Sequence, residues 1–200
     1  MNTIETFNQA LFMTINATPA TPAWLIGTAL VFANYLIWLI PLGLVMMWLS
    51  GDIQQRGLAI RACVVTLLAL GANQVIGLVW PHPRPFMIGL GHTFLQHAAD
   101  SSFPSDHGTV FSAVALTLLR GRMVRTGSMT VAAGIVVAWA RIFLGVHFPL
   151  DMIGAAAVPC IVYAATAPLW NAGGSTLTRL VVALYRTLLA RPIGLGWLRP

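Results

Sequence analysis

The 200-residue chain is 58% hydrophobic and only 8% charged, whereas soluble proteins average roughly 25% charged residues. All 11 basic residues are arginines, and the formal net charge is +6. Because these arginines lie between apolar stretches, they orient a membrane protein, and we do not expect nucleic-acid binding. The composition therefore excludes an ordinary soluble protein and predicts an all-α, polytopic helical bundle in which residues 1–200 form a single membrane-embedded domain.

The first predicted element is an amphipathic helix over residues 4–15 that lies at the membrane interface, because its apolar residues repeat at helical spacing. No basic leader with a short apolar core and a small-residue cleavage site is visible, so we expect the first span to be retained.

Five apolar stretches follow, and a hydrocarbon core about 30 Å thick needs roughly 20 residues per helix. We place the spans near residues 22–49, 57–80, 104–120, 128–146 and 150–170. Pro41 predicts a kink or tilt in the first span. The third span is short and begins among polar residues, so we expect protein to cover its outer end.

A linker-like stretch at 171–175 and an amphipathic surface helix near 177–188 complete the predicted elements. Cys63 and Cys160 fall within the apolar spans, far from any metal-ligand spacing, so neither a disulfide nor a metal site is predicted.

Arginines in alternate connections predict the orientation. Nine of them flank one side of the predicted spans: Arg56, Arg61, Arg120, Arg122, Arg125, Arg179, Arg186, Arg191 and Arg199. This side is cytoplasmic by the positive-inside tendency. The N-terminus, the 81–103 loop and the 144–150 turn are then expected to face outward.

Three polar clusters lie on that outward side, each at the end of an apolar stretch. They are Arg84-Pro85, then Pro104-Ser105-Asp106-His107, then Arg141 with His147 and Asp151. Taken singly, they also fit an arginine that anchors a span, a capped helix start, and an interfacial histidine–aspartate pair. Together they can bring two guanidiniums, two imidazoles and a carboxylate to one place, which favours a site that binds and cleaves a phosphate.

The second cluster begins a helix, where unsatisfied backbone N–H groups favour anions, and Ser101 or Ser102 could cap it. In the third cluster, Asp151 can accept a hydrogen bond from one ring nitrogen of His147 and leave the other free to attack. Arg141, still within an apolar span, requires an anionic partner.

This pattern resembles the type 2 phosphatidic acid phosphatase superfamily, whose motifs are K-x6-R-P, P-S-G-H and S-R-x5-H-x3-D. The corresponding residues are Gly77-x6-Arg84-Pro85, Pro104-Ser105-Asp106-His107 and Ala140-Arg141-x5-His147-x3-Asp151. Here glycine replaces the lysine, Asp106 replaces the second motif's glycine, and alanine replaces the serine. His82 is a candidate substitute for the missing lysine, although a solvated loop histidine is the alternative.

The resemblance implies catalysis without a metal or other cofactor. His147, oriented by Asp151, would form a phosphohistidine, and His107 would protonate the leaving oxygen. Arg84, Arg141 and Ser105 would hold the phosphoryl oxygens together with backbone N–H groups. Asp106, Gly108 and His82 complete the expected substrate-binding set.

The run from Phe103 to Thr109 resembles the bacitracin-resistance branch, the undecaprenyl-diphosphate phosphatases, which implies a polyprenyl diphosphate substrate in a bacterial inner membrane. A phosphatase for phosphatidylglycerophosphate or lipid A, a lipid phosphotransferase, and a non-catalytic lipid-binding or transport protein remain alternatives. His92 and His97 are expected to be solvated loop residues, with a lid over the site as the alternative. The sequence gives no indication of the oligomeric state.

Overall fold

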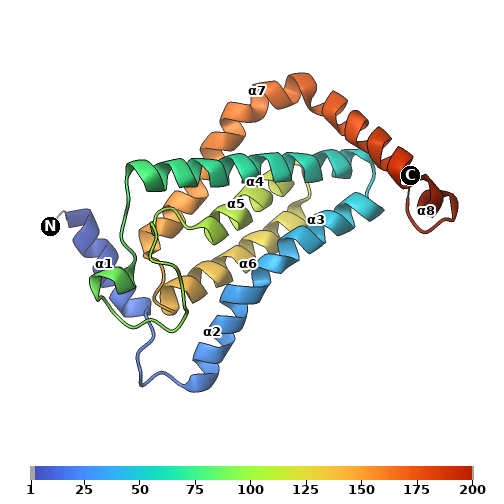
Figure 1. Ribbon diagram of the computed structural model, residues 1–200. Helices are drawn as coiled ribbons and strands as arrows, with labels where there is room; N and C mark the ends of the chain where they lie inside the picture. Colours follow the sequence, from blue (N-terminus) through green and yellow to red (C-terminus); the bar gives the residue numbers. More distant parts are fainter. Residues whose placement is uncertain (1–2, 200) are drawn as a thin grey trace.

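The computed structural model describes residues 3–199, and every regular element in that range is helical. The elements are α1 (Thr3–Ile15), α2 (Ala23–Tyr35), η1 (Leu36–Trp38), α3 (Leu39–Ser50), α4 (Ile53–Val79), η2 (Pro85–Ile88), α5 (Asp106–Arg120), α6 (Val124–Phe143), α7 (Pro149–Leu188) and α8 (Ala190–Gly194). Figure 1 shows the long helices running side by side as an elongated bundle, with α1 across one end. The expected all-α membrane architecture is confirmed.

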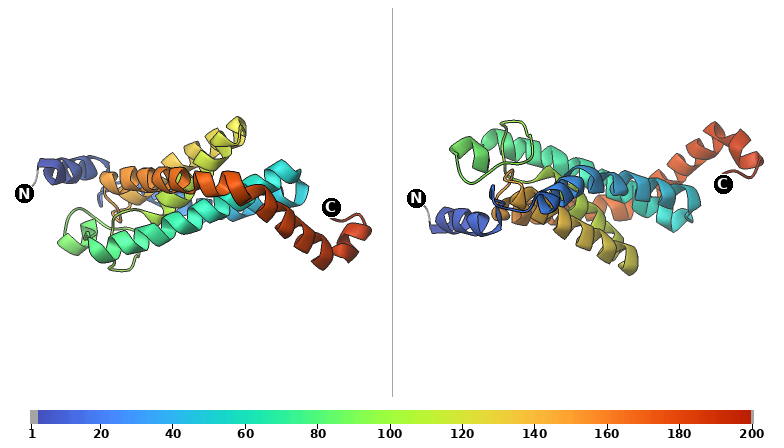
Figure 2. Two further views of the ribbon diagram at one scale, coloured as in Figure 1. Left: turned by 90° about the horizontal axis from the view of Figure 1, so that it is seen from above. Right: turned by 90° about the horizontal axis from the view of Figure 1, so that it is seen from below.

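Helix α5 lies inside the bundle, where it packs against α4, α6 and α7 (Figures 1 and 2). Four helical stretches in residues 3–199 are long and apolar enough to cross a membrane, namely Ala23–Ser50, Ile53–Val79, Val124–Phe143 and Pro149–Leu188. The fifth predicted span corresponds to α5, whose 15 residues reach only about 22 Å. The number five is therefore approximate, and protein surrounds the short helix.

The first span is divided by the 3₁₀ turn η1, which separates α2 from α3. Pro41 is the third residue of α3. This is the first helical turn, where a missing backbone N–H costs little. The predicted irregularity of this span thus lies just before the proline.

Helix α4 begins at Ile53, four residues before the predicted start of the second span, because Asp52 and Gln55 form a capping box. The guanidinium of Arg56 is buried, with its Nε donating to the carbonyl of Trp48 at 2.9 Å and its Cζ 5.0 Å from the ring centre of Tyr185. The span predicted near 57–80 begins one residue after this arginine, whereas carbonyl and aromatic contacts hold it within the first turns of α4.

Helix α7 is continuous over 40 residues, so the predicted linker at 171–175 is wrong and the C-terminal amphipathic segment extends the fifth span. A side chain at Gly174 would meet the ring of Trp170 at 2.7 Å. The glycine therefore makes room for an indole and does not break the helix. Figure 1 shows a bend within α7, which contains Pro159 and Pro168, and proline is the usual cause of such bends.

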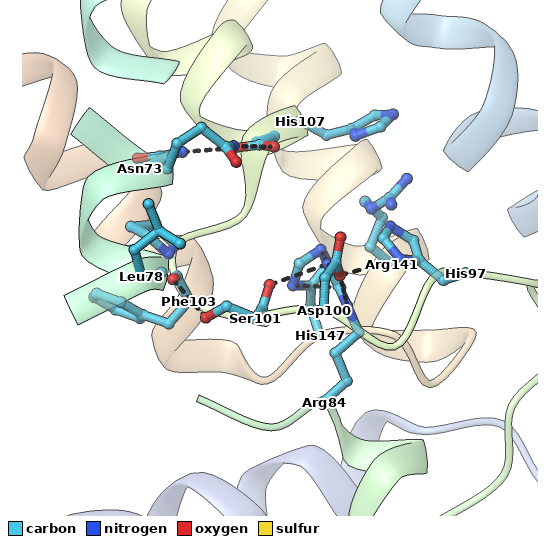
Figure 3. Close-up of a pocket in the computed structure, with 14 residues that line it drawn as sticks. Asn73, Leu78, Arg84, His97, Asp100, Ser101, Phe103, His107, Arg141 and His147 are labelled. Carbon is cyan, nitrogen blue, oxygen red and sulfur yellow. Dashed lines mark hydrogen bonds and ion pairs between the residues drawn. The ribbon is translucent and has the colours of Figure 1, made fainter. Parts of the chain in front are cut away.

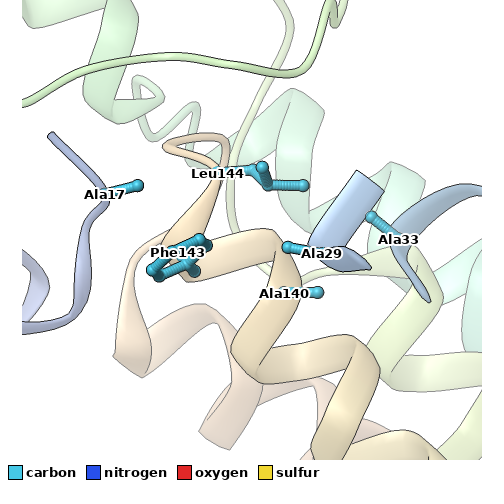
Figure 4. Close-up of a cluster of buried hydrophobic side chains, with 6 residues drawn as sticks. All are labelled: Ala17, Ala29, Ala33, Ala140, Phe143 and Leu144. Atoms are coloured by element: carbon cyan, nitrogen blue, oxygen red, sulfur yellow. The ribbon is translucent and has the colours of Figure 1, made fainter. Parts of the chain in front are cut away.

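Small side chains seat α2 against the end of α6 (Figure 4). The buried cluster consists of Ala17, Ala29, Ala33, Ala140, Phe143 and Leu144. Alanines allow the two helices to approach closely, and the side chain of Arg141 then reaches the Ala33 carbonyl, with its Nη1 at 3.4 Å. This packing fixes where the arginine leaves α6.

The ends of the bundle differ in charge. The α3–α4 and α5–α6 connections, which adjoin Arg56, Arg120 and Arg122, lie at the end opposite α1, the 80–105 loop and the α6–α7 turn (Figures 1 and 2). The outward polar clusters predicted from the sequence thus share one end of the molecule.

Candidate active site

A cavity of about 280 Å³ lies at the end where α4, α5 and the α6–α7 turn meet (Figure 3). Its lining combines residues from all three predicted clusters with part of the 97–104 loop. The lining residues are Asn73, Gln74, Gly77, Leu78, Arg84, His97, Asp100, Ser101, Phe103, Pro104, Asp106, His107, Arg141 and His147. The fold therefore brings Arg84, Asp106, His107, Arg141 and His147 to one place.

His147 lies in the turn between α6 and α7, and Asp151 is the third residue of α7. Pro149 begins α7 and fixes this spacing, as proline favours the first helical position. The Nδ1 of His147 lies 3.2 Å from Oδ2 of Asp151, and both residues are buried. This contact assigns the proton to Nδ1, so Nε2 keeps its lone pair for nucleophilic attack.

Ser102 completes this pair from a different segment of the chain. Its hydroxyl donates a short hydrogen bond to Oδ2 of Asp151 and lies 3.3 Å from Nδ1 of His147. The same carboxylate oxygen accepts the backbone N–H of Phe148 at 2.7 Å. Three donors thus converge on one oxygen and fix the carboxylate against the imidazole.

Burial lowers the pKa of His147 to about 4, and the hydrogen bond and negative charge of Asp151 act in the opposite direction without overcoming it; the positive charges of Arg84 and Arg141 lower this pKa further. The imidazole is therefore neutral at neutral pH, which is the form that can act as a nucleophile.

Arg84 leaves the loop between two prolines and is buried with 4% exposure. Its Nη1 lies 3.1 Å from Nε2 of His147 and donates to the Val146 carbonyl at 2.9 Å. The opposite edge contacts Asp100, with Nε and Nη2 each 2.8 Å from Oδ1. A phosphoryl oxygen that displaces the Nη1–Nε2 contact would be held by the guanidinium while its phosphorus faces the imidazole.

Arg141 lines the cavity from the last turn of α6 and is buried with 3% exposure. Apart from the contact with Ala33, its guanidinium is incompletely satisfied, since Nε has no hydrogen-bond partner among residues 3–199. Arg141 is therefore a buried cation at the edge of a polar cavity, which suits an anionic ligand.

The first turn of α5 supplies His107 and Asp106, and Figure 3 shows His107 across the cavity from His147. The carboxylate of Asp106 accepts hydrogen bonds from the amides of Asn73 at 2.9 Å and Gln74 at 3.4 Å. Neutral donors of α4 thus hold the aspartate that departs from the family motif.

Three expected substrate-binding residues make other contacts. Ser105 is buried and caps α5, with its hydroxyl accepting the N–H of Gly108 at 3.4 Å. The cap is therefore neither Ser101 nor Ser102. Gly108 packs against α7, since a Cβ there would meet the Cβ of Ala155 at 2.8 Å. His82 lies outside the cavity, with its Nε2 3.7 Å from Glu5 of α1.

The sequence did not indicate the roles of two residues at this site: His97 lines the cavity, and Ser102 supports Asp151. His97 was expected to be solvated, yet it lines the cavity with its ring centre 6.1 Å from that of His147. Ser102 was considered only as a cap. Both lie in irregular backbone, where no periodicity indicates which way a side chain points.

The fold and this cavity define a class: a polytopic membrane protein whose site pairs a buried, neutral imidazole with two guanidiniums, a combination suited to a phosphate ligand. The sequence model described as "PAP2 superfamily" matches residues 58–173, and the chain belongs to this superfamily.

Known relatives agree with this assignment. The chain is 40% identical to the putative undecaprenyl-diphosphatase YbjG of Escherichia coli over 98% of its own length and 99% of that protein. It is 38% identical to the undecaprenyl-diphosphatase BcrC of Bacillus subtilis over 60% of this chain and 61% of the other. The crystal structure of Aquifex aeolicus LpxE shares the fold, with a TM-score of 0.60 and 24% identity over 81% of this chain and 95% of that one.

The lowered pKa of His147 predicts the acid limb of the pH–rate profile. If the neutral imidazole is the nucleophile, kcat/KM should fall only as pH decreases through about 4, well below the ordinary histidine value near 6.5. Replacing Asp151 by Asn removes a charge that raises this pKa, so the limb should move to lower pH. A limb caused by ionisation of the substrate phosphate serves as the internal control, because it should lie at the same pH in the wild type and in Asp151→Asn. An enzyme limb that stays near 6.5 in both proteins would contradict the assignment.

Ser102→Ala removes a hydrogen bond to a charged, buried carboxylate. Such bonds contribute roughly 1.5–3 kcal/mol, so kcat should fall about 10- to 100-fold if the bond orients the nucleophile. Thr117→Val is the matched control, because the hydroxyl of Thr117 is also buried but bonds only to the Ala113 carbonyl within α5. Equal kcat values for Ser102→Ala and the control would show that the serine does not position the pair.

Proposed function

We propose that the protein is a lipid phosphatase that removes the terminal phosphate of undecaprenyl diphosphate through a phosphohistidine intermediate. The observation that carries this proposal is the contact of Arg84 with Nε2 of His147 at 3.1 Å, because it places a phosphate-binding group against the nucleophilic nitrogen. The names of the two undecaprenyl-diphosphatase relatives support the choice of substrate.

In the first step Nε2 of His147 attacks the terminal phosphorus, and the bond to the bridging oxygen breaks to release the lipid monophosphate. Arg84 and Arg141 balance the charge that gathers on the phosphoryl oxygens. His107, across the cavity, donates a proton to the leaving oxygen. Burial and the positive charge of Arg141 lower the pKa of His107 to about 3, so in this mechanism the negative charge of the bound diphosphate must raise this pKa before His107 carries the proton. Water then attacks the phosphorus and gives a proton to His107, and the bond between phosphorus and Nε2 breaks. Inorganic phosphate leaves, and both imidazoles return to their starting states.

The positive-inside tendency supports a periplasmic or extracellular active site in a bacterial inner membrane, because the arginine-rich connections lie at the opposite end of the bundle. An outward site suits the recycling of a carrier lipid for cell-wall synthesis, which is the role that we propose.

The test is phosphate release by the purified protein from three groups of lipids: polyprenyl diphosphates, polyprenyl monophosphates, and glycerolipid or lipid A phosphates. We expect the diphosphates to be preferred in kcat/KM, and His147→Ala to abolish turnover. Preference for another group of lipids would contradict the proposed substrate, and transfer of phosphate to a lipid acceptor would contradict hydrolysis. Normal turnover by His147→Ala would exclude His147 as the nucleophile.

His107 should be less important for a diphosphate than for a monophosphate. The leaving group of a diphosphate is a phosphate whose own pKa is near 6, so it departs readily without a proton. An alkoxide leaving group needs one, and a general acid contributes about 10²- to 10⁴-fold.

We therefore expect His107→Ala to reduce kcat by at most about tenfold on a polyprenyl diphosphate and by at least about 100-fold on the matching monophosphate. Wild-type protein assayed on the same two lipids is the reference. Equal losses on both substrates would show that His107 acts by holding the phosphoryl group that both share.

A further inference from the structure

Helix α1 lies outside the segment matched by the superfamily, yet it runs along the turn that carries His147 (Figure 1). At one end of this turn the Phe143 carbonyl accepts the backbone N–H of Ala17 at 2.9 Å and the side-chain amide of Asn16 at 3.0 Å. In the middle, the rings of Phe12 and Phe148 pack edge to face with centres 5.3 Å apart.

The contact at the other end is made by Asn8, which is buried with 1% exposure. Its Oδ1 accepts the backbone N–H of Leu150 at 3.1 Å. Leu150 is the second residue of α7, and the N–H groups of a first helical turn have no partner within the helix. An N-cap side chain usually accepts this hydrogen bond, but the N-cap of α7 is Phe148, which has no side-chain acceptor.

We propose that Asn8 is a positioning residue for the reaction, acting as a cap supplied by α1 to the first turn of α7. That turn also contains Asp151, whose carboxylate orients His147. The position of the His147 imidazole therefore depends on a residue far away in the sequence. This inference rests on the proposed role of His147 and deepens it.

The contacts that α1 and the two residues after it make at the two ends of the turn explain why one side chain matters. Ala17 and Asn16 fix the end that leaves α6, and Asn8 fixes the end that enters α7, so the imidazole between them is held from both sides. Removing Asn8 leaves the first fixed and releases the second. Because near-attack geometry is sensitive to displacements of about 1 Å, the loss should appear in kcat and not in KM.

The experiment compares Asn8→Ala with Gln9→Ala in the full-length protein. Gln9 is the matched control, because it is the neighbouring amide on the same helix, only partly buried, and its side chain donates to Glu5 at 2.9 Å. We expect Asn8→Ala to lower kcat on a polyprenyl diphosphate on the order of tenfold with KM unchanged, and Gln9→Ala to match the wild type.

Hydrogen–deuterium exchange of the peptide that contains Leu150 provides a readout independent of activity. Exchange should be faster in Asn8→Ala than in wild type or Gln9→Ala, and Asn8→Ser, which keeps an oxygen acceptor, should fall between them. If Asn8→Ala does not fold, Asn8→Ser carries both measurements. Unchanged exchange with unchanged kcat would overturn the inference, as would a loss of kcat that Gln9→Ala shares. Lack of turnover by the wild type would instead overturn the proposed function.

Discussion

The site depends on burial of the Arg84 guanidinium. A charge removed from water is tolerated only when partners surround it, and here the partners come from separate places: Asp100 and the Ser101 carbonyl in one loop, the Val146 carbonyl and His147 in another. Meeting this requirement draws the α4–α5 loop onto the α6–α7 turn. The cavity is the space left beside that junction, and the arginine that would bind phosphate is also the residue that assembles its walls.

The need for partners also explains the different roles of the three carboxylates near the cavity. Asp151 is buried with His147 and serves as an acceptor for donors that fix the imidazole, whereas Asp100, with 60% of its side chain exposed, balances Arg84 from the solvent side. Asp106 is held by the neutral amides of Asn73 and Gln74. Each of these three carboxylates therefore has hydrogen-bond partners other than Arg141, so the charge of Arg141 remains available to an anionic ligand.

Local rules predicted the long helices and the residues that begin them, because apolar length, proline at a first turn and motif spacing depend on neighbours in the chain. Prediction failed at 171–175, where two glycines suggested a linker, although the helix is continuous and the ring of Trp170, one turn earlier, occupies the space beside Gly174. It also failed where distant packing decides. Which of several serines caps α5 and which one supports Asp151 depends on how the loop folds back onto α7, and the turn of His97 into the cavity has the same origin. Nothing in the first 20 residues indicated that α1 would contact α7.

The length of α7 has a consequence for where chemistry occurs relative to the lipid. Forty residues extend about 60 Å as a straight helix, twice the hydrocarbon thickness of about 30 Å. In the proposed orientation its first half crosses the bilayer, and beyond the bend Arg179 and Arg186 can rest on the phosphate layer of the inner leaflet. One continuous helix would then link the position of Asp151 at the outer leaflet to an anchor at the inner leaflet. The thickness of the bilayer would therefore set how far a diphosphate must rise out of the outer leaflet to reach the imidazole.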